Sequence, residues 1–197
     1  LFERAWSLCG MEQLMIWMAT EPTFVKELMA RIADYNCRLI ANAAELGVDC
    51  IHYGDDWGTQ HGLLFSPEMW QELIRPDFAR MCVQARKNGL LNSLHSCGKV
   101  DELIPAMIEC GVDVFDPFQP EVMDARAVKR EYEGRIAFWG GLSVQNVLPY
   151  GTADEVEAEV RALLADLGSG GGYILSPSHS VSGDVPPTNV DAFLRAA

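Results

Sequence analysis

A histidine and a cysteine stand two positions apart in the segment His95-Ser96-Cys97-Gly98, directly after the apolar run 89–94. If that run forms a strand, side chains at positions i and i+2 point to the same side. The imidazole and the thiol then converge on one point, and zinc binds such nitrogen and sulfur ligands tetrahedrally. Because the pair supplies only two ligands, any further ligand must come from elsewhere in the chain.

Composition and charge indicate a globular protein and exclude several partners. The chain has 197 residues, 49% of them apolar, which is enough for one sizeable core. Its formal net charge of -13 repels nucleic acid and anionic membrane surfaces. Charged and polar residues interrupt every apolar stretch before the ~18 residues of a membrane span, and no basic segment precedes an apolar one. We therefore expect a cytoplasmic protein that binds neither nucleic acid nor membranes.

The six cysteines favour reduced thiols over disulfides. A chain of this size without a secretory signal does not need cross-links, so we expect most of its cysteines to be reduced and buried. Only Cys97 has a chemically suggestive setting. The chain also begins at Leu1, without methionine, inside a helical pattern, which is typical of a fragment.

Helical and strand patterns alternate along the chain. Apolar periodicity and end signals predict helices over 2–18, 21–46, 66–88, 100–110, 124–132, 152–167 and 189–197. Thr152-Ala153-Asp154-Glu155 reads as a capping box at the start of its helix. Short apolar runs predict strands at 48–53, 89–94, 112–115, 135–139 and 173–175.

Continuously apolar strands joined by helices are typical of parallel β/α units buried on both faces. A doubly wound sheet and part of a β/α barrel both fit this pattern. No Gly-x-Gly-x-x-Gly follows a strand, which disfavours the nucleotide-binding doubly wound sheet. A closed barrel of eight units needs ~250 residues. We therefore predict an α/β fold of the (β/α)8 TIM-barrel type, with roughly the later five β/α units in one partial domain over residues 1–197.

Polar groups and glycines follow each predicted strand, at the end where parallel β/α folds hold their working residues. They occupy positions 54–58, 95–98, 116–119, 140–141 and 176–179. From this set the predicted catalytic residues are Asp55, Asp56 and His179, and the predicted substrate-binding residues are Trp57, Gln119, Gly140 and Gly141.

Each of these features also has a structural interpretation. The adjacent acids Asp55 and Asp56 can shape and cap a loop, and the two glycines can form a turn instead of letting a substrate approach the backbone. His179 on its own is typical of a surface loop. We interpret His52 and His61 as ordinary histidines without a ligand role.

A barrel would bring His95, Cys97 and His179 to one rim, and we predict that they bind zinc together. Three protein ligands leave one tetrahedral position open, which distinguishes a catalytic zinc from a structural one. Such a zinc can hold an incoming thiol as a thiolate, which is a nucleophile for a methyl group. Asp55 or Asp56 can orient a ligand imidazole or complete the coordination while the site is empty.

Several segments, in order from about Gly47 to the C-terminus, together resemble the uroporphyrinogen decarboxylase superfamily. They are Gly54-Asp55-Asp56-Trp57-Gly58 with Ser66-Pro67-Glu68, His95-Ser96-Cys97-Gly98, Gly140-Gly141-Leu142 ahead of Leu148-Pro149-Tyr150-Gly151-Thr152, and Ile174-Leu175-Ser176-Pro177-Ser178-His179 followed by Pro186-Pro187-Thr188-Asn189-Val190. The resemblance implies a β/α barrel and one of two enzyme classes. Tetrapyrrole decarboxylases use no cofactor, whereas corrinoid-linked methyltransferases use zinc to activate a thiol such as coenzyme M. The methyltransferases carry a similar His-x-Cys and a distal cysteine, and this chain has His179 in the region of that cysteine.

We predict a zinc-dependent methyltransferase that moves a methyl group between a corrinoid carrier and a thiol or similar acceptor. The implied partners are a small-molecule substrate and a corrinoid protein. If the chain is incomplete, its exposed edge strands should also pair with a second copy of the chain or with a missing segment. A cofactor-free porphyrinogen decarboxylase of tetrapyrrole biosynthesis is the alternative, with an Asp and His179 stabilising charge on a pyrrole. A second alternative is a catalytically silent barrel fragment or assembly subunit.

Overall fold

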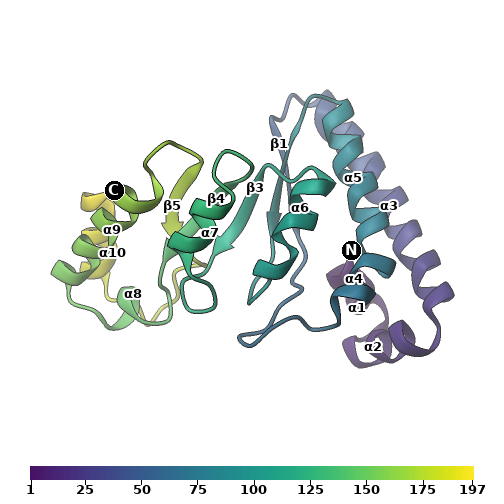
Figure 1. The fold of residues 1–197 in the computed structure, drawn as a ribbon, viewed down its shortest axis with the longest axis horizontal. Coiled ribbons are helices and arrows are strands. Elements are labelled where there is room, and N and C mark those ends of the chain that lie inside the picture. The colour runs from purple at the N-terminus through teal and green to yellow at the C-terminus, as the bar shows by residue number, and fades with distance from the viewer. The chain divides into compact units, whose positions relative to one another are not determined.

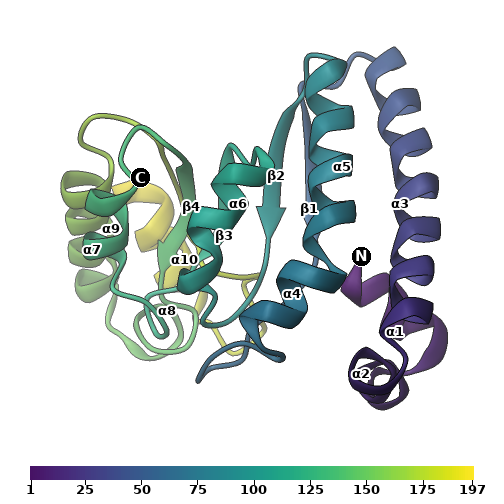
Figure 2. The ribbon, with the colours of Figure 1, turned by 45° about the vertical axis from the view of Figure 1, so that its right-hand side comes forward.

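A computed structural model describes residues 1–197, which form two compact units, Leu1–Asp113 and Val114–Ala197 (Figure 1). The helices of the first unit are α1 (Phe2–Cys9), α2 (Met11–Thr20), α3 (Pro22–Glu45), α4 (Pro67–Leu73), α5 (Arg75–Lys87), the 3-10 turn η1 (Asp101–Leu103) and α6 (Ile104–Cys110). Its strands are β1 (Cys50–Gly54) and β2 (Leu91–His95), which run parallel. Helices α3 and α5 pack side by side beside these strands (Figure 2).

Aromatic side chains fill the core of the first unit next to the segment that follows β1. Trp57, Trp70 and Phe78 are almost fully buried. The ring of Trp57 meets those of Trp70 and Phe78 edge-on, with centroids 5.2 and 5.4 Å apart. Because these large rings are buried and contact one another edge to face, they hold the Trp57 side chain in one position. Because Trp57 belongs to the loop after β1, the core holds that loop in place.

The second unit contains three parallel strands covered by helices. Its strands are β3 (Val114–Phe118), β4 (Ala137–Leu142) and β5 (Tyr173–Pro177), and its helices are α7 (Ala125–Glu131), α8 (Val147–Tyr150), α9 (Ala153–Leu167) and α10 (Pro187–Ala196). Strand β4 pairs with β3 on one side and with β5 on the other. Phe118 and Phe138 stack with centroids 4.5 Å apart, and both are fully buried.

The predicted alternation of strands and helices is confirmed, with several boundaries corrected. The helix predicted over 2–18 is two helices, because Gly10 has a φ of 88° that ends α1 before α2 begins. The helix predicted over 66–88 is also two, because Pro76 lacks an N–H to donate to the preceding turn and α4 stops near Ile74. The third and fourth strands begin and end later than predicted, and α8 was not predicted. Each helix falls short of the length or the apolar character that crossing a bilayer requires.

The cysteines are reduced as predicted, but most of them are not buried. All six are free thiols, and only Cys82 and Cys110 are buried. Burial raises the pKa of both thiols. Cys50 is exposed because it opens β1 at the surface of the first unit. The expectation of mostly buried cysteines is therefore wrong.

The capping box predicted for α9 is present. The Thr152 hydroxyl accepts from the Glu155 backbone N–H at 3.3 Å, and the Glu155 carboxylate accepts from the Thr152 N–H at 2.7 Å. That backbone hydrogen bond lowers the pKa of Glu155 below its ordinary value of 4.5. The stabilisation is therefore fully present above pH 4.5 and is lost as the pH falls through the lowered pKa.

We expect Thr152→Ala to destabilise the protein by about 1 kcal/mol, because it leaves an N-terminal N–H of α9 without its cap. Urea unfolding measures this change. Thr188→Ala is the matched control, since Thr188 is exposed in the first turn of α10 and has no cap hydrogen bond. Equal unfolding midpoints for the two variants would contradict the role of the capping box.

Candidate metal site

The His-x-Cys pair places two zinc-binding atoms at one point. Strand β2 ends at His95, and the Sγ of Cys97 lies 3.2 Å from the Nε2 of His95. A zinc ion bound to both atoms at ordinary bond lengths and a tetrahedral angle would separate them by about 3.5 Å. The spacing also suits a hydrogen bond between the sulfur and the imidazole nitrogen, which is the contact the pair makes without a metal. The donor set and its geometry therefore fit one zinc ion.

Asp56 adds a carboxylate to this pair. Its Oδ1 accepts from the backbone N–H of Cys97 at 2.7 Å and lies 3.7 Å from the Nε2 of His95. The Asp56 side chain is 38% exposed, so this carboxylate is partly open to solvent. Because Asp56 follows β1 and Cys97 follows β2, the carboxylate ties the two loops together. It can orient a ligand or act as one.

Glycines let the two loops touch backbone to backbone. Gly98 has a φ of +87°, and a Cβ placed there would lie 2.5 Å from the carbonyl carbon of Gly58. A Cβ at Gly58 would in turn lie 2.8 Å from the carbonyl oxygen of Cys97. The Lys99 N–H donates to the Thr59 carbonyl at 2.8 Å and closes the contact. The loop that follows β1 therefore packs closely against the loop that follows β2, and this packing sets the position of Cys97.

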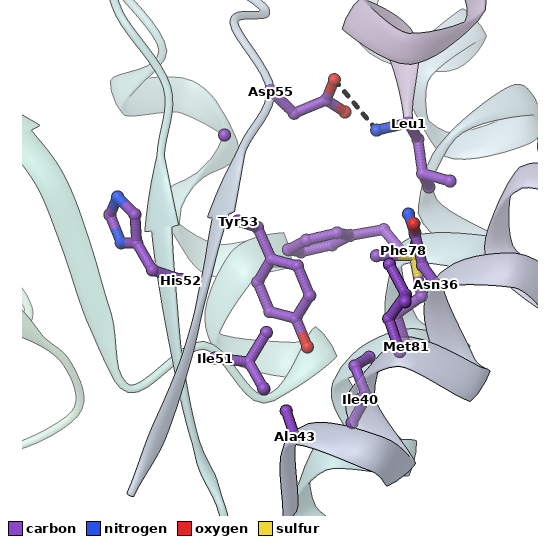
Figure 3. Close-up of a pocket in the computed structure, with 12 residues that line it drawn as sticks. Leu1, Asn36, Ile40, Ala43, Ile51, His52, Tyr53, Asp55, Phe78 and Met81 are labelled. Carbon is purple, nitrogen blue, oxygen red and sulfur yellow. Dashed lines mark hydrogen bonds and ion pairs between the residues drawn. The ribbon is translucent and has the colours of Figure 1, made fainter. Parts of the chain in front are cut away.

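Asp55, the neighbour of Asp56, accepts hydrogen bonds that stabilise the fold. It is buried and accepts from the backbone N–H groups of Phe2 and Glu3, at 3.1 and 2.8 Å, at the start of α1. It also accepts from the indole N–H of Trp57 at 2.8 Å, and its Oδ1 lies 3.1 Å from the amino group of Leu1 (Figure 3). Asp55 thus caps a helix far away in the sequence. Catalysis by Asp55 and substrate contact by the buried Trp57 stay predictions.

Glu3 is a candidate that the sequence did not reveal. Burial raises the pKa of the Glu3 carboxyl, and the nearby carboxylates of Asp56 and Asp55 raise it further. Its Oε2 lies 3.9 Å from where a Cβ of Gly54 would be, at the end of β1. No spacing signal connects Glu3 to the His-x-Cys pair, because α1 reaches the end of β1 only through the fold.

In the second unit, the predicted site residues follow the strand ends. Gln119 is buried just after β3. Gly140 and Gly141 have φ values of 124° and 98°, and the Tyr173 hydroxyl donates to the Gly140 carbonyl at 2.8 Å. A Cβ at Gly141 would lie 2.7 Å from that hydroxyl, so packing alone accounts for this glycine. His179 is exposed directly after β5. The substrate and metal roles of these residues stay predictions.

A polar cluster in the second unit also escaped the sequence analysis. The Ser143 hydroxyl donates to Oε1 of Glu121 and accepts from the Asn146 N–H at 2.9 Å. Oε2 of Glu121 and the hydroxyl of Ser178 are buried without a hydrogen-bond partner. Buried polar atoms that lack partners are rare in native proteins, and an ordered water or ion is one explanation for them.

Comparison with known proteins places the chain in a family. The family model described as uroporphyrinogen decarboxylase (URO-D) matches residues 2–197. The uroporphyrinogen decarboxylase of Methylococcus capsulatus is 25% identical over 183 residues, which cover 91% of this chain and 49% of that protein. A methylcobamide:CoM methyltransferase of Methanosarcina barkeri is 28% identical over 163 residues, which cover 79% of this chain and 43% of that protein. The chain thus spans about half the length of the curated relatives it matches.

A solved structure supports the fold independently. A methyltransferase from Methanosarcina mazei superposes with a TM-score of 0.80 at 20% identity, over 98% of this chain and 54% of that one. The predicted α/β fold of the β/α-barrel type is confirmed by this likeness. The relatives include both decarboxylases and methyltransferases, so they show the family without selecting between its enzymes. With a match over nearly its whole length, the chain belongs to the uroporphyrinogen decarboxylase family.

Proposed function

We propose that the chain is part of a zinc-dependent methyltransferase that moves a methyl group between a corrinoid carrier and a thiol. The observation that carries this proposal is the 3.2 Å approach of Cys97 Sγ to His95 Nε2, with the carboxylate of Asp56 beside them. The similarity to an enzyme named for methylcobamide and coenzyme M supports the corrinoid and thiol substrates. A cytoplasmic location and a corrinoid protein as partner belong to the same proposal.

Three residues of the first unit would hold the metal. His95 and Cys97 bind it directly, and Asp56 fixes the Cys97 backbone while its charge stays near the imidazole. A bound zinc ion supplies the positive charge that turns an incoming thiol into a thiolate nucleophile. His179 is the proposed third ligand. We propose that Gln119, Gly140 and Gly141 line the substrate side.

A cofactor-free porphyrinogen decarboxylase is the second candidate, and the similarity to the Methylococcus capsulatus enzyme favours it. In that case Asp56, which is partly exposed, and His179 would stabilise positive charge on a pyrrole ring instead of serving a metal. The two candidates differ in whether the activity needs zinc.

A turnover assay distinguishes the candidates. We expect the purified zinc-loaded protein to demethylate methylcobalamin when a thiol is added, followed by the change in cobalamin absorbance. Removal of zinc with a chelator should stop the reaction, and added zinc should restore it. Decarboxylation of a porphyrinogen by the chelated protein, with no methyl transfer, would overturn the proposal in favour of the second candidate.

We expect Asp56→Asn to weaken zinc binding or methyl transfer by roughly 10- to 100-fold, because it removes the charge beside His95. Competition with a chromophoric chelator measures the affinity. Asp49→Asn, at an exposed position just before β1, is the control and should behave as the unchanged protein. An Asp56→Asn protein with unchanged affinity and rate would remove Asp56 from the site.

A further inference from the structure

We propose that His52 is a positioning residue for His95, holding that imidazole with its Nε2 toward the sulfur of Cys97. This inference rests on the proposed metal site. The sequence marked His52 as an ordinary histidine, and neither the His-x-Cys pattern nor the acidic pair after β1 involves it.

The register of the two strands places His52 beside the site. In the parallel pair of β1 and β2, His52 is opposite Ser93 and Gly54 is opposite His95. Because residues two apart in a strand share a face, these four positions lie on one side of the pair. Gly54 has no side chain, so His52 is the side chain of β1 on this face that lies next to His95.

A hydrogen bond fixes the ring of His52. Its Nδ1 lies 2.9 Å from the Oγ of Ser93, which is 4% exposed. Ser93 sits two residues before His95 on the same strand, so His52 is anchored to the strand that carries the proposed ligand. An anchored ring restrains its neighbour more than a freely rotating one does.

The two imidazoles meet edge to face. Their ring centroids lie 6.3 Å apart with an angle of 71° between the planes. This arrangement limits rotation of the His95 ring on one side, and the Cys97 sulfur lies at its Nε2 on the other. Groups that orient a ligand imidazole raise the metal affinity, because the ring then loses less rotational freedom when it binds the metal.

His52 is not needed for the core, so its role can be separated from stability. Figure 3 shows the His52 ring on the opposite side of β1 from Tyr53, Phe78 and Met81. Those residues line a cavity of about 290 Å³ between β1 and helices α3 and α5, which His52 also borders. The His52 side chain is exposed, and replacing it removes little buried contact.

Cobalt binding tests the proposal, because the absorption of Co²⁺ reports both affinity and ligand geometry. We expect His52→Ala to weaken Co²⁺ binding by about 10-fold and to alter the Co²⁺ ligand-field bands. Its urea unfolding midpoint should stay unchanged. His52→Phe keeps an aromatic edge and should recover part of the affinity, whereas Ser93→Ala should weaken binding by freeing the His52 ring. His61→Ala, at an exposed loop histidine, is the matched control and should leave affinity and spectrum unchanged.

The outcomes separate this inference from the proposed function. If the unchanged protein binds no Co²⁺ or Zn²⁺, the metal site itself fails. If it binds Co²⁺ and the His52 and Ser93 variants match it in affinity and spectrum, the metal site stands and the positioning role of His52 is overturned. Should His52→Ala fail to fold, the His52→Phe and Ser93→Ala proteins decide the same question.

Discussion

Replacing Cys97 with serine is expected to lower zinc affinity by more than about 100-fold. That figure is the upper end of the loss seen when a group that only supports a ligand is removed, and here a ligand itself is lost. A serine hydroxyl stays protonated near neutral pH, whereas a cysteine gives up its proton to the metal. The Cys97 sulfur lies 3.2 Å from His95 Nε2, so its replacement removes the sulfur ligand from that position.

Competition with a chromophoric chelator measures this affinity directly. Cys50→Ser is the matched control, because Cys50 is a free, exposed thiol on β1 of the same unit and should not affect binding. Cys97 is only half-buried, so the near-isosteric change should leave the fold intact. Zinc bound equally well by the Cys97→Ser and Cys50→Ser proteins would show that the thiol is not a ligand.

Gly98→Ala is expected to destabilise the protein by about 2 to 5 kcal/mol. The φ of +87° costs an alanine about 1–2 kcal/mol. The new Cβ would also stand 2.5 Å from the Gly58 carbonyl carbon and 2.7 Å from the Thr59 carbonyl oxygen, where only backbone can give way. Forcing atoms into a packed contact adds about 1–3 kcal/mol. The strain lies next to Cys97, so zinc affinity should fall together with stability.

Gly89→Ala separates the two causes. Gly89 has a φ of +75°, but a Cβ there would meet nothing within 4 Å. Its replacement should therefore cost only the backbone strain of about 1–2 kcal/mol and leave the metal site unchanged. Urea unfolding of both variants gives the comparison. If the Gly98→Ala protein is no less stable than the Gly89→Ala protein, the two loops do not pack as closely as described.

Much of the fold could be predicted because its signals are local. The imidazole and the thiol of the His-x-Cys pair lie 3.2 Å apart, although β2 ends at His95 and Cys97 lies in the loop beyond it, where the strand period no longer applies. Helix starts such as Thr152 and Ser66 carry their own capping side chains, and both form the expected hydrogen bonds. Helix breaks were missed where a single residue outweighed the apolar pattern, as at Gly10.

The sequence could not predict which of the two acids, Asp55 or Asp56, lies beside the His-x-Cys pair. Both acids follow β1, and nothing in their spacing says which one faces the imidazole. Asp55 turns to the N–H groups at the start of α1, a helix some fifty positions away in sequence, while Asp56 meets Cys97 and His95. Glu3 was missed for the same reason. Contacts made only by the folded chain leave no periodicity to recognise.

X-ray absorption at the zinc edge tests the central claim most directly, because it reports which atoms surround the metal. For the zinc-loaded protein we predict one sulfur at ~2.3 Å and imidazole nitrogen at ~2.0–2.1 Å, with the sulfur lost in Cys97→Ser. A shell of oxygen and nitrogen alone in the unchanged protein, identical in Cys97→Ser, would contradict the account.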